Sequence, residues 1–145
     1  MAFVGVERAV RQILQDDADV FAVSGTRVYP GKAAQGAQLP YLVYQMVANQ
    51  HHEQFGGSAG LANALIQISG FSTSKSEVLD LREKVRLALQ GRSPGNVTVA
   101  GDTFDVRSIH LDGDRDIDVD PRDASDGEIF GFSMDFRVGY PEPVP

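Results

Sequence analysis

The chain contains no cysteine among its 145 residues. Disulfides, thiolate metal sites and cysteine nucleophiles are therefore excluded, and the composition fits a reducing cytoplasm. No stretch approaches the roughly 18 consecutive apolar residues of a membrane span, so we expect no membrane partner. Charged residues interrupt the apolar ones at the N-terminus, which lacks the apolar core of a signal peptide.

A surplus of basic residues is missing as well. The formal net charge is −7, and residues 102–128 alone hold ten acidic residues and three arginines. The remaining segments hold equal numbers of acidic and basic residues, so the whole imbalance lies in one stretch. The basic footprint that grips nucleic-acid phosphates is absent, and sequence-specific binding of DNA or RNA is not expected.

Two segments show the apolar periodicity of helices. Residues 3–15 place apolar side chains at three-four spacing. In the second segment, Ser74 and Glu77 form a capping box, in which the hydroxyl and the carboxylate each satisfy a backbone amide. Val78, Leu81 and Val85 then form its buried stripe.

Several other segments show the pattern of strands. Phenylalanine, methionine, valine and tyrosine alternate with small or polar residues over 130–140, the period of a half-buried strand. Segments 40–47 and 61–71 are also strand-like, and 96–106 reads as a hairpin that turns at Gly101 and Asp102. A bulge near Arg107 and Ser108 would reconcile the parity of the residues that follow.

The sum of these elements is an α+β fold. We expect a mostly antiparallel sheet of about four to six strands, packed with one or two main helices, in a single domain over 1–140. Residues 141–145 are proline-rich and are expected to form a loose tail. Segments 31–39 and 48–60 read as long polar loops, a length that is often functional.

Five aspartates fall on alternate positions of one short segment: Asp112, Asp114, Asp116, Asp118 and Asp120. In an extended chain they would share one face about 7 Å apart, too far for neighbours to hold one small ion together. An EF-hand calcium loop fails because the required glycine is missing from each possible register. A solvated acidic surface is the favoured interpretation, and a calcium-responsive binding module is the alternative.

Three short patterns in the sequence resemble parts of catalytic or metal sites. Ser58 lies in a G-x-S-x-G pattern, which marks a hydrolase only on a strand-to-helix elbow, and here a polar loop precedes it. The pair Ser72 and Lys75 lacks the companion motifs of serine hydrolases. His51 and His52 stand in a polar loop without a set of four metal ligands. We expect no enzyme, cofactor or metal site, with a serine hydrolase acting through Ser58 as the alternative.

The order of elements resembles the tail terminator, or tail completion, proteins of long-tailed phages and prophages. The resemblance spans nearly the whole chain. It is carried by "RVYPG…QLPYLVYQ" from position 27, by the capped helix, and by the closing "S-x-D-F-R-V" strand after an acidic loop. The long acidic loop at 112–128 departs from the usual pattern.

The resemblance implies a structural protein of the virion, placed at the junction of tail and head. Such proteins form a ring, expected to be a hexamer, that caps the tail tube, stops its polymerisation and joins it to the head-side connector. DNA passes through the ring without being read. Its partners would be further copies of itself, the tail tube protein and the connector or stopper protein of the head.

Two sets of residues are candidates for these contacts. A closed ring needs two different patches that meet head to tail, and we expect them in the two long loops and on the sheet edge. The expected interface residues are Arg27, Tyr29, His51, Gln54 and Phe55. The five aspartates are expected to form an acidic annulus in the lumen or at the rim, because carboxylates repel the DNA duplex.

Overall fold

The computed structural model describes residues 5–33, 37–54, 57–90, 92, 95–119 and 129–141, without the side chains of 50–61, 118 and 119. The described residues form three helices and seven strands, in the order α1 (Val6–Asp16), α2 (Ala18–Ser24), β1 (Val28–Pro30), β2 (Tyr41–Gln54), β3 (Gly57–Ser72), α3 (Lys75–Gln90), β4 (Gly95–Val99), β5 (Asp102–Val106), β6 (Ser108–Val119) and β7 (Ile129–Pro141). None of the described helices is long and apolar enough to cross a membrane.

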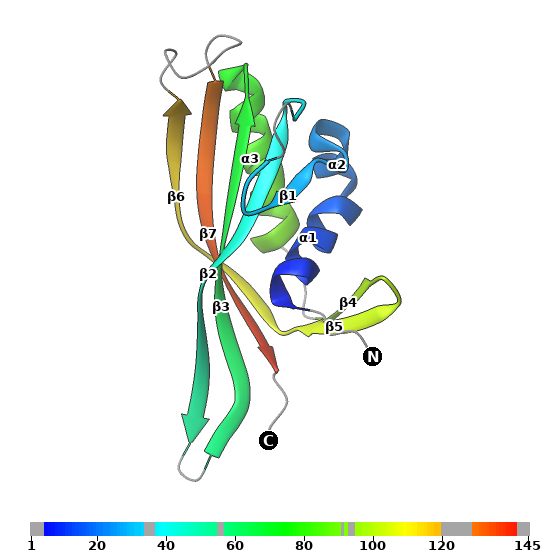
Figure 1. Cartoon of the computed structure of the whole chain (residues 1–145), viewed down its shortest axis with the longest axis vertical. Coiled ribbons are helices and arrows are strands. Elements are labelled where there is room, and N and C mark those ends of the chain that lie inside the picture. Colours follow the sequence, from blue (N-terminus) through cyan, green and yellow to red (C-terminus); the bar gives the residue numbers. More distant parts are fainter. Residues whose placement is uncertain are drawn as a thin grey trace.

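The strands form a five-stranded sheet in the order β1-β2-β3-β7-β6 and a separate pair of β4 and β5. Among the described strands, β1 and β2 run parallel and the other pairs are antiparallel. The helices lie against one face of the large sheet (Figure 1), and its other face is left uncovered by the described elements. The expected α+β class with a mostly antiparallel sheet is confirmed.

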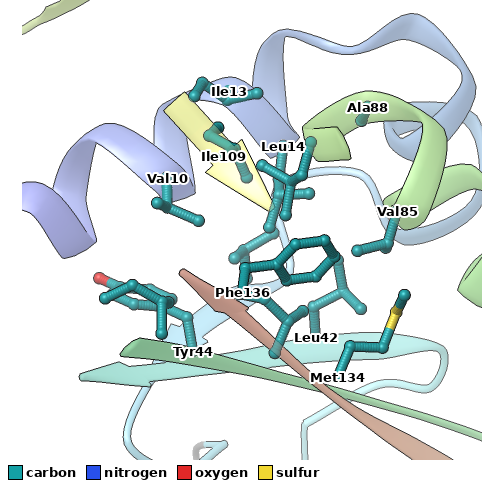
Figure 2. Packing of buried hydrophobic residues seen from close by; sticks show 14 of the residues in the cluster. Val10, Ile13, Leu14, Leu42, Tyr44, Val85, Ala88, Ile109, Met134 and Phe136 are labelled. Atoms are coloured by element: carbon teal, nitrogen blue, oxygen red, sulfur yellow. The ribbon is translucent and has the colours of Figure 1, made fainter. Parts of the chain in front are cut away.

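The core lies between the helices and the covered face of the sheet. Alternation along β7 places Phe132, Met134 and Phe136 on this face, where none of them is exposed to solvent. Leu14 from α1 and Val85 from α3 pack onto them from the helical layer (Figure 2). These apolar side chains come from segments far apart in the chain, so their burial fixes the helices over the sheet.

The helix ends follow from local chemistry. The Ser74 hydroxyl accepts a hydrogen bond from the Glu77 backbone N–H at 3.3 Å, as the capping box requires. The Glu77 carboxylate instead accepts a hydrogen bond from the Ser72 hydroxyl, at 2.5 Å. At α2, the Asp17 carboxylate caps the first turn, and Gly25, with φ of 57°, ends the helix.

The polar segment 48–60 was expected to be a loop, but its described residues are the end of β2 and the beginning of β3, which form a long hairpin. Strand β2 continues to Gln54 and pairs with β3 as far as Gly57. Strand β3 pairs with β7 only from Leu61 onward, so the end of the hairpin projects past the rest of the sheet (Figure 1). A polar sequence is compatible with these strands because this end of the hairpin extends past the part of the sheet that the helices cover (Figure 1).

The bulge expected near Arg107 lies elsewhere. Strands β4 and β5 pair around a turn at Ala100 and Gly101, one residue before the expected position. At Arg107 the chain leaves this pair and joins the large sheet, with the Arg107 N–H bound to the Gly139 carbonyl at 2.8 Å. The change of parity therefore arises from a change of sheet, and the bulge comes at Asp112 in β6.

Candidate functional site

The aspartate-rich segment forms most of β6, which is an edge strand of the large sheet. The pairing of β6 with β7 shifts by one residue at Asp112, the extra residue of a β-bulge. Beyond the bulge, Asp114 and Asp116 lie opposite Met134 and Phe132, at the edge of the helix-covered face. The expectation that the aspartates share one face is therefore wrong, because the bulge separates Asp112 from the next two.

One arginine of α3 binds two of these carboxylates. The Arg82 guanidinium donates two hydrogen bonds to Asp114, at 3.1 and 2.5 Å, and one to Asp116, at 2.9 Å. Lys75, at the start of the same helix, lies 3.7 Å from the Asp116 carboxylate. A guanidinium shared between two carboxylates ties the helix to the edge strand through charge-assisted hydrogen bonds.

The carboxylates on the uncovered face are also neutralised. Asp112 lies 3.5 Å from Arg137, and Arg115 lies 3.2 Å from Asp135 on β7. Across both faces, four carboxylates meet four cations, and the eight residues are Asp112, Asp114, Asp116, Asp135, Lys75, Arg82, Arg115 and Arg137. The described part of the acidic stretch is therefore balanced in charge. The unbalanced charge follows it in the sequence, where residues 118–128 hold five acidic residues and one arginine.

Neither alternative function gains support from this geometry. Among the described residues, no three histidine, aspartate or glutamate side chains gather as metal ligands would. The Asp118 side chain and Asp120 lie outside the described part, so for them the calcium alternative stays a prediction. Ser58 lies within β3 and pairs with Glu53 across the hairpin, whereas a nucleophile elbow requires a turn from a strand into a helix.

The expected interface residues occupy three different settings. Arg27 donates hydrogen bonds to the backbone carbonyls of Pro40, at 2.8 Å, and Val23, at 3.3 Å, so its guanidinium joins two segments of its own chain. Tyr29 lies half-buried on β1. His51 and Gln54 lie near the end of the projecting hairpin, and Phe55 is outside the described residues.

The uncovered face of the sheet carries an aromatic row. The rings of Tyr29 and Tyr41 meet edge to face at 5.9 Å, and those of Tyr41 and Phe71 lie 5.5 Å apart. Phe71 lies over Gly131, where an added Cβ would stand only 2.7 Å from its ring. A hollow of about 260 Å³ opens beside the row, and Lys32 lies at its border.

Below this row the uncovered face becomes polar. The Gln45 amide donates to Gln67 at 2.9 Å, and the Gln67 amide donates to the Ser133 hydroxyl at 2.7 Å. Partial burial, followed by the neighbouring Tyr29, raises the pKa of Tyr41 above its usual value. The face therefore combines an aromatic patch with side chains that are hydrogen-bonded to one another, a composition suited to contact with a protein or with water.

The sequence did not predict that Arg82 binds the carboxylates of the acidic strand. Arg82 and Asp114 stand 32 positions apart, and no short-range pattern links them. The available signal was indirect, since Arg82 lies beside the buried stripe of α3 rather than on its most exposed side. The aromatic row was missed for a similar reason, because its members come from three strands.

Comparison with known proteins gives two findings. The family model of tail completion protein gp17 matches residues 8–138. A chain of the solved structure "Virion of native gene transfer agent (GTA) particle" has a TM-score of 0.71 and 18% identity, with 94% of this chain and 94% of that chain covered. At such low identity this likeness shows a shared fold. No curated protein sequence matches the chain.

Proposed function

Because the chain belongs to the family of tail completion protein gp17, we propose that it caps the tail tube, ends its polymerisation and joins the tail to the head-side connector. The observation that carries the proposal is the family match over 8–138, which runs from α1 into β7, the last strand of the sheet. Its partners are the tail tube protein, the connector or stopper protein and further copies of itself. It is made in the host cytoplasm and resides in the virion.

The protein acts as a ring of identical copies, six in the simplest arrangement, with DNA passing through the centre. A ring that closes needs two different patches on each copy. The described structure offers several unlike surfaces, among them the uncovered sheet face, the β6 edge and the projecting hairpin. Tyr29, His51, Gln54 and Phe55 remain the proposed contact residues, whereas the internal bonds of Arg27 favour a role in holding its own subunit together.

The β6 edge with Asp112, Asp114 and Asp116 lies at the rim of the ring. Phosphate contacts from lysine and arginine add affinity for DNA and would hold a duplex that has to slide. At this edge every described cation meets a carboxylate, so the rim presents little free positive charge. Asp112, Asp114 and Asp116 contribute paired carboxylates to this rim, and Asp118 and Asp120, whose side chains lie outside the described residues, complete the proposed acidic annulus.

A role in assembly requires no bond to be made or broken. Membership in a family of tail completion proteins supports a structural rather than an enzymatic role. The position of Ser58 within a strand gives no support to a hydrolase. Replacing Ser58 with alanine should leave assembly of infectious particles unchanged, and a loss of infectivity at normal protein level would favour the hydrolase.

The projecting hairpin gives a local test of ring closure. Deletion of residues 50–59 removes the end of the hairpin, where β3 pairs only with β2, and should leave the core intact. The variant should keep its cooperative unfolding and be absent from purified tails. A control that replaces the same residues with glycine and serine separates the need for side chains from the need for length. Normal incorporation of the deletion variant would remove the hairpin from the interface.

The function as a whole is tested by removing the gene from the producing strain. Electron microscopy of the lysate should show filled heads without tails, together with tail tubes of irregular length. Expression of the wild-type chain in trans should restore joined particles and a uniform tail length. Joined particles of normal length in the deletion strain would contradict the proposal.

A further inference from the structure

A second hollow lies on the helix-covered side of the molecule, between α1 and the turn that joins β4 to β5. It has a volume of about 440 Å³, and its border includes Arg8 and Arg11 of α1 and Val99 beside the turn. Tyr44 of β2 also lines it. Figure 2 shows the Tyr44 hydroxyl at the outer edge of the core cluster, pointing away from Phe136. The border is therefore rich in hydrogen-bond donors.

The two arginines set this hollow apart from the rest of the surface. Arg8 and Arg11 are one helical turn apart on α1, and both are exposed. Within the described part of the chain, neither takes part in a hydrogen bond or an ion pair, whereas Arg82, Arg115 and Arg137 each bind carboxylates. Two unpaired guanidinium groups on one side of a hollow favour an anionic occupant.

The charge pattern favours an acidic protein segment over nucleic acid as this occupant. Phosphate backbones are bound by extended basic stripes, and here two arginines stand alone on a chain with a net charge of −7. Residues 118–128 hold Asp118, Asp120, Asp123, Asp126 and Glu128 with a single arginine. This segment therefore has a formal net charge of −4 in the sequence, from five acidic residues and one arginine.

The acidic segment cannot reach the hollow of its own chain. Strand β6 begins directly after β5 and extends over eleven residue steps, which place its end about 36 Å away at ~3.3 Å per step. The hollow lies near the beginning of this path, because α1 packs against β4 and β5. The nine residues 120–128 join the end of β6 to the start of β7, which pair through Val119 and Ile129. A segment of this length whose two ends are held together can extend about 15 Å from them, half of its extended length.

We propose that the Arg8–Arg11 hollow of one copy receives the acidic segment 118–128 of a neighbouring copy. The two patches are unlike and complementary in charge, which is the form of contact that closes a ring head to tail. The inference rests on the proposed self-assembly, and it names the residues and the chemistry of one contact. It also explains why α1 presents arginines without partners in the isolated chain.

The first test uses a fluorescent peptide of residues 118–128 and the full-length protein. The peptide should bind, and the double variant Arg8→Glu, Arg11→Glu should bind at least about tenfold more weakly, because two attractive contacts become repulsive. The single variants Arg11→Glu and Lys32→Glu change the net charge equally. Lys32 borders the other hollow, so only Arg11→Glu should weaken binding. Binding should also fall with added salt.

The second test exchanges the charges between copies. One variant carries Arg8→Glu and Arg11→Glu. The other carries Asp120→Arg, Asp123→Arg and Asp126→Arg, which leaves two acidic residues and four arginines in residues 118–128 and makes the segment positive. Each alone should fail to associate, whereas their mixture should form alternating assemblies detectable by native mass spectrometry, because each loop then meets a hollow of opposite charge. Recovery in the mixture is a result that a merely misfolded variant could not give.

The outcomes separate this contact from the function proposed above. Equal binding of the peptide to the wild type and the double variant, or no binding at all, would overturn the contact. Stronger competition by a short DNA duplex than by unlabelled peptide would also overturn it, since the hollow would then prefer phosphates. If the double variant still caps tails at wild-type efficiency, the contact is refuted and the capping function stands.

Discussion

Replacement of Arg82 by alanine is the sharpest test of how α3 and the acidic edge strand are joined. Arg82 makes three hydrogen bonds across 32 and 34 positions of sequence, to Asp114 and Asp116. Its side chain is 24% exposed, less than most of the charged side chains paired on this surface. Without it, the carboxylates of Asp114 and Asp116 lose their shared guanidinium, and among the described cations Lys75 remains 3.7 Å from Asp116.

The expected loss follows from the geometry. An exposed ion pair contributes about 0–1 kcal/mol, and a guanidinium that binds one carboxylate through two nitrogens lies at the upper end of the range. Two such contacts, together with the new repulsion between the carboxylates, give a decrease of about 1–2 kcal/mol in the free energy of unfolding. The decrease should shrink in 1 M salt, where screening acts over about 3 Å.

Urea unfolding of the wild type and the variant measures this difference, provided that the slope of the transition is unchanged. Arg86→Ala is the matched control. Arg86 pairs with Glu83 on the same helix, which lowers the pKa of Glu83 and raises that of Arg86, but it joins no second element. The control should therefore lose less stability. Equal midpoints for the two variants at low salt would refute the view that Arg82 fastens β6 to α3.

Three further predictions concern the core and the uncovered face. Gly70→Ala should lower the free energy of unfolding by about 1–3 kcal/mol through overpacking, because a Cβ there would overlap the ring of Phe132 and lie 2.9 Å from Leu42. Gly95→Ala, with nothing within 4 Å of the added Cβ, should cost far less, and equal thermal midpoints for the two variants would contradict this. Phe136→Ala should lose about 3–5 kcal/mol in urea unfolding, and Leu87→Ala, at a side chain 58% exposed, less than about 0.5 kcal/mol. The raised pKa of Tyr41 means that its neutral form is favoured in the fold, so its contribution to stability is present below pH 10 and is lost as the pH rises through the folded-state pKa. Ultraviolet titration of the wild type against Tyr41→Phe should show that the missing transition is the later one.

Local patterns predicted the parts of the fold that local chemistry determines. The stripe of α3, its serine cap and the alternation along β7 are each set by neighbours within a few positions, and all three are present. The hairpin at 48–60 was mistaken for a loop because glycine, glutamine and histidine are poor strand formers. Its pairing partner, rather than its own propensity, determines its conformation.

The candidate site was less accessible from the sequence. The regular aspartate spacing suggested one acidic face, and a single bulge at Asp112 was enough to divide it. An isolated glycine such as Gly113 can mark a bulge within a strand, but which residue bulges depends on how β6 and β7 align. The cations that pair with the aspartates of β6 come from α3 and β7, far away in the sequence. The sequence alone therefore does not show that these carboxylates are paired.

The central claim is that this chain acts as one of several identical copies at the end of a tail tube. Cryo-electron microscopy of intact particles, with the reconstruction focused on the head-proximal end of the tail, tests it most directly. The proposed function predicts a ring of copies around an open channel. The described sheet with its three helices should fit the density of each copy. Absence of the chain from that position, or its presence as a single copy away from the axis, would contradict the account.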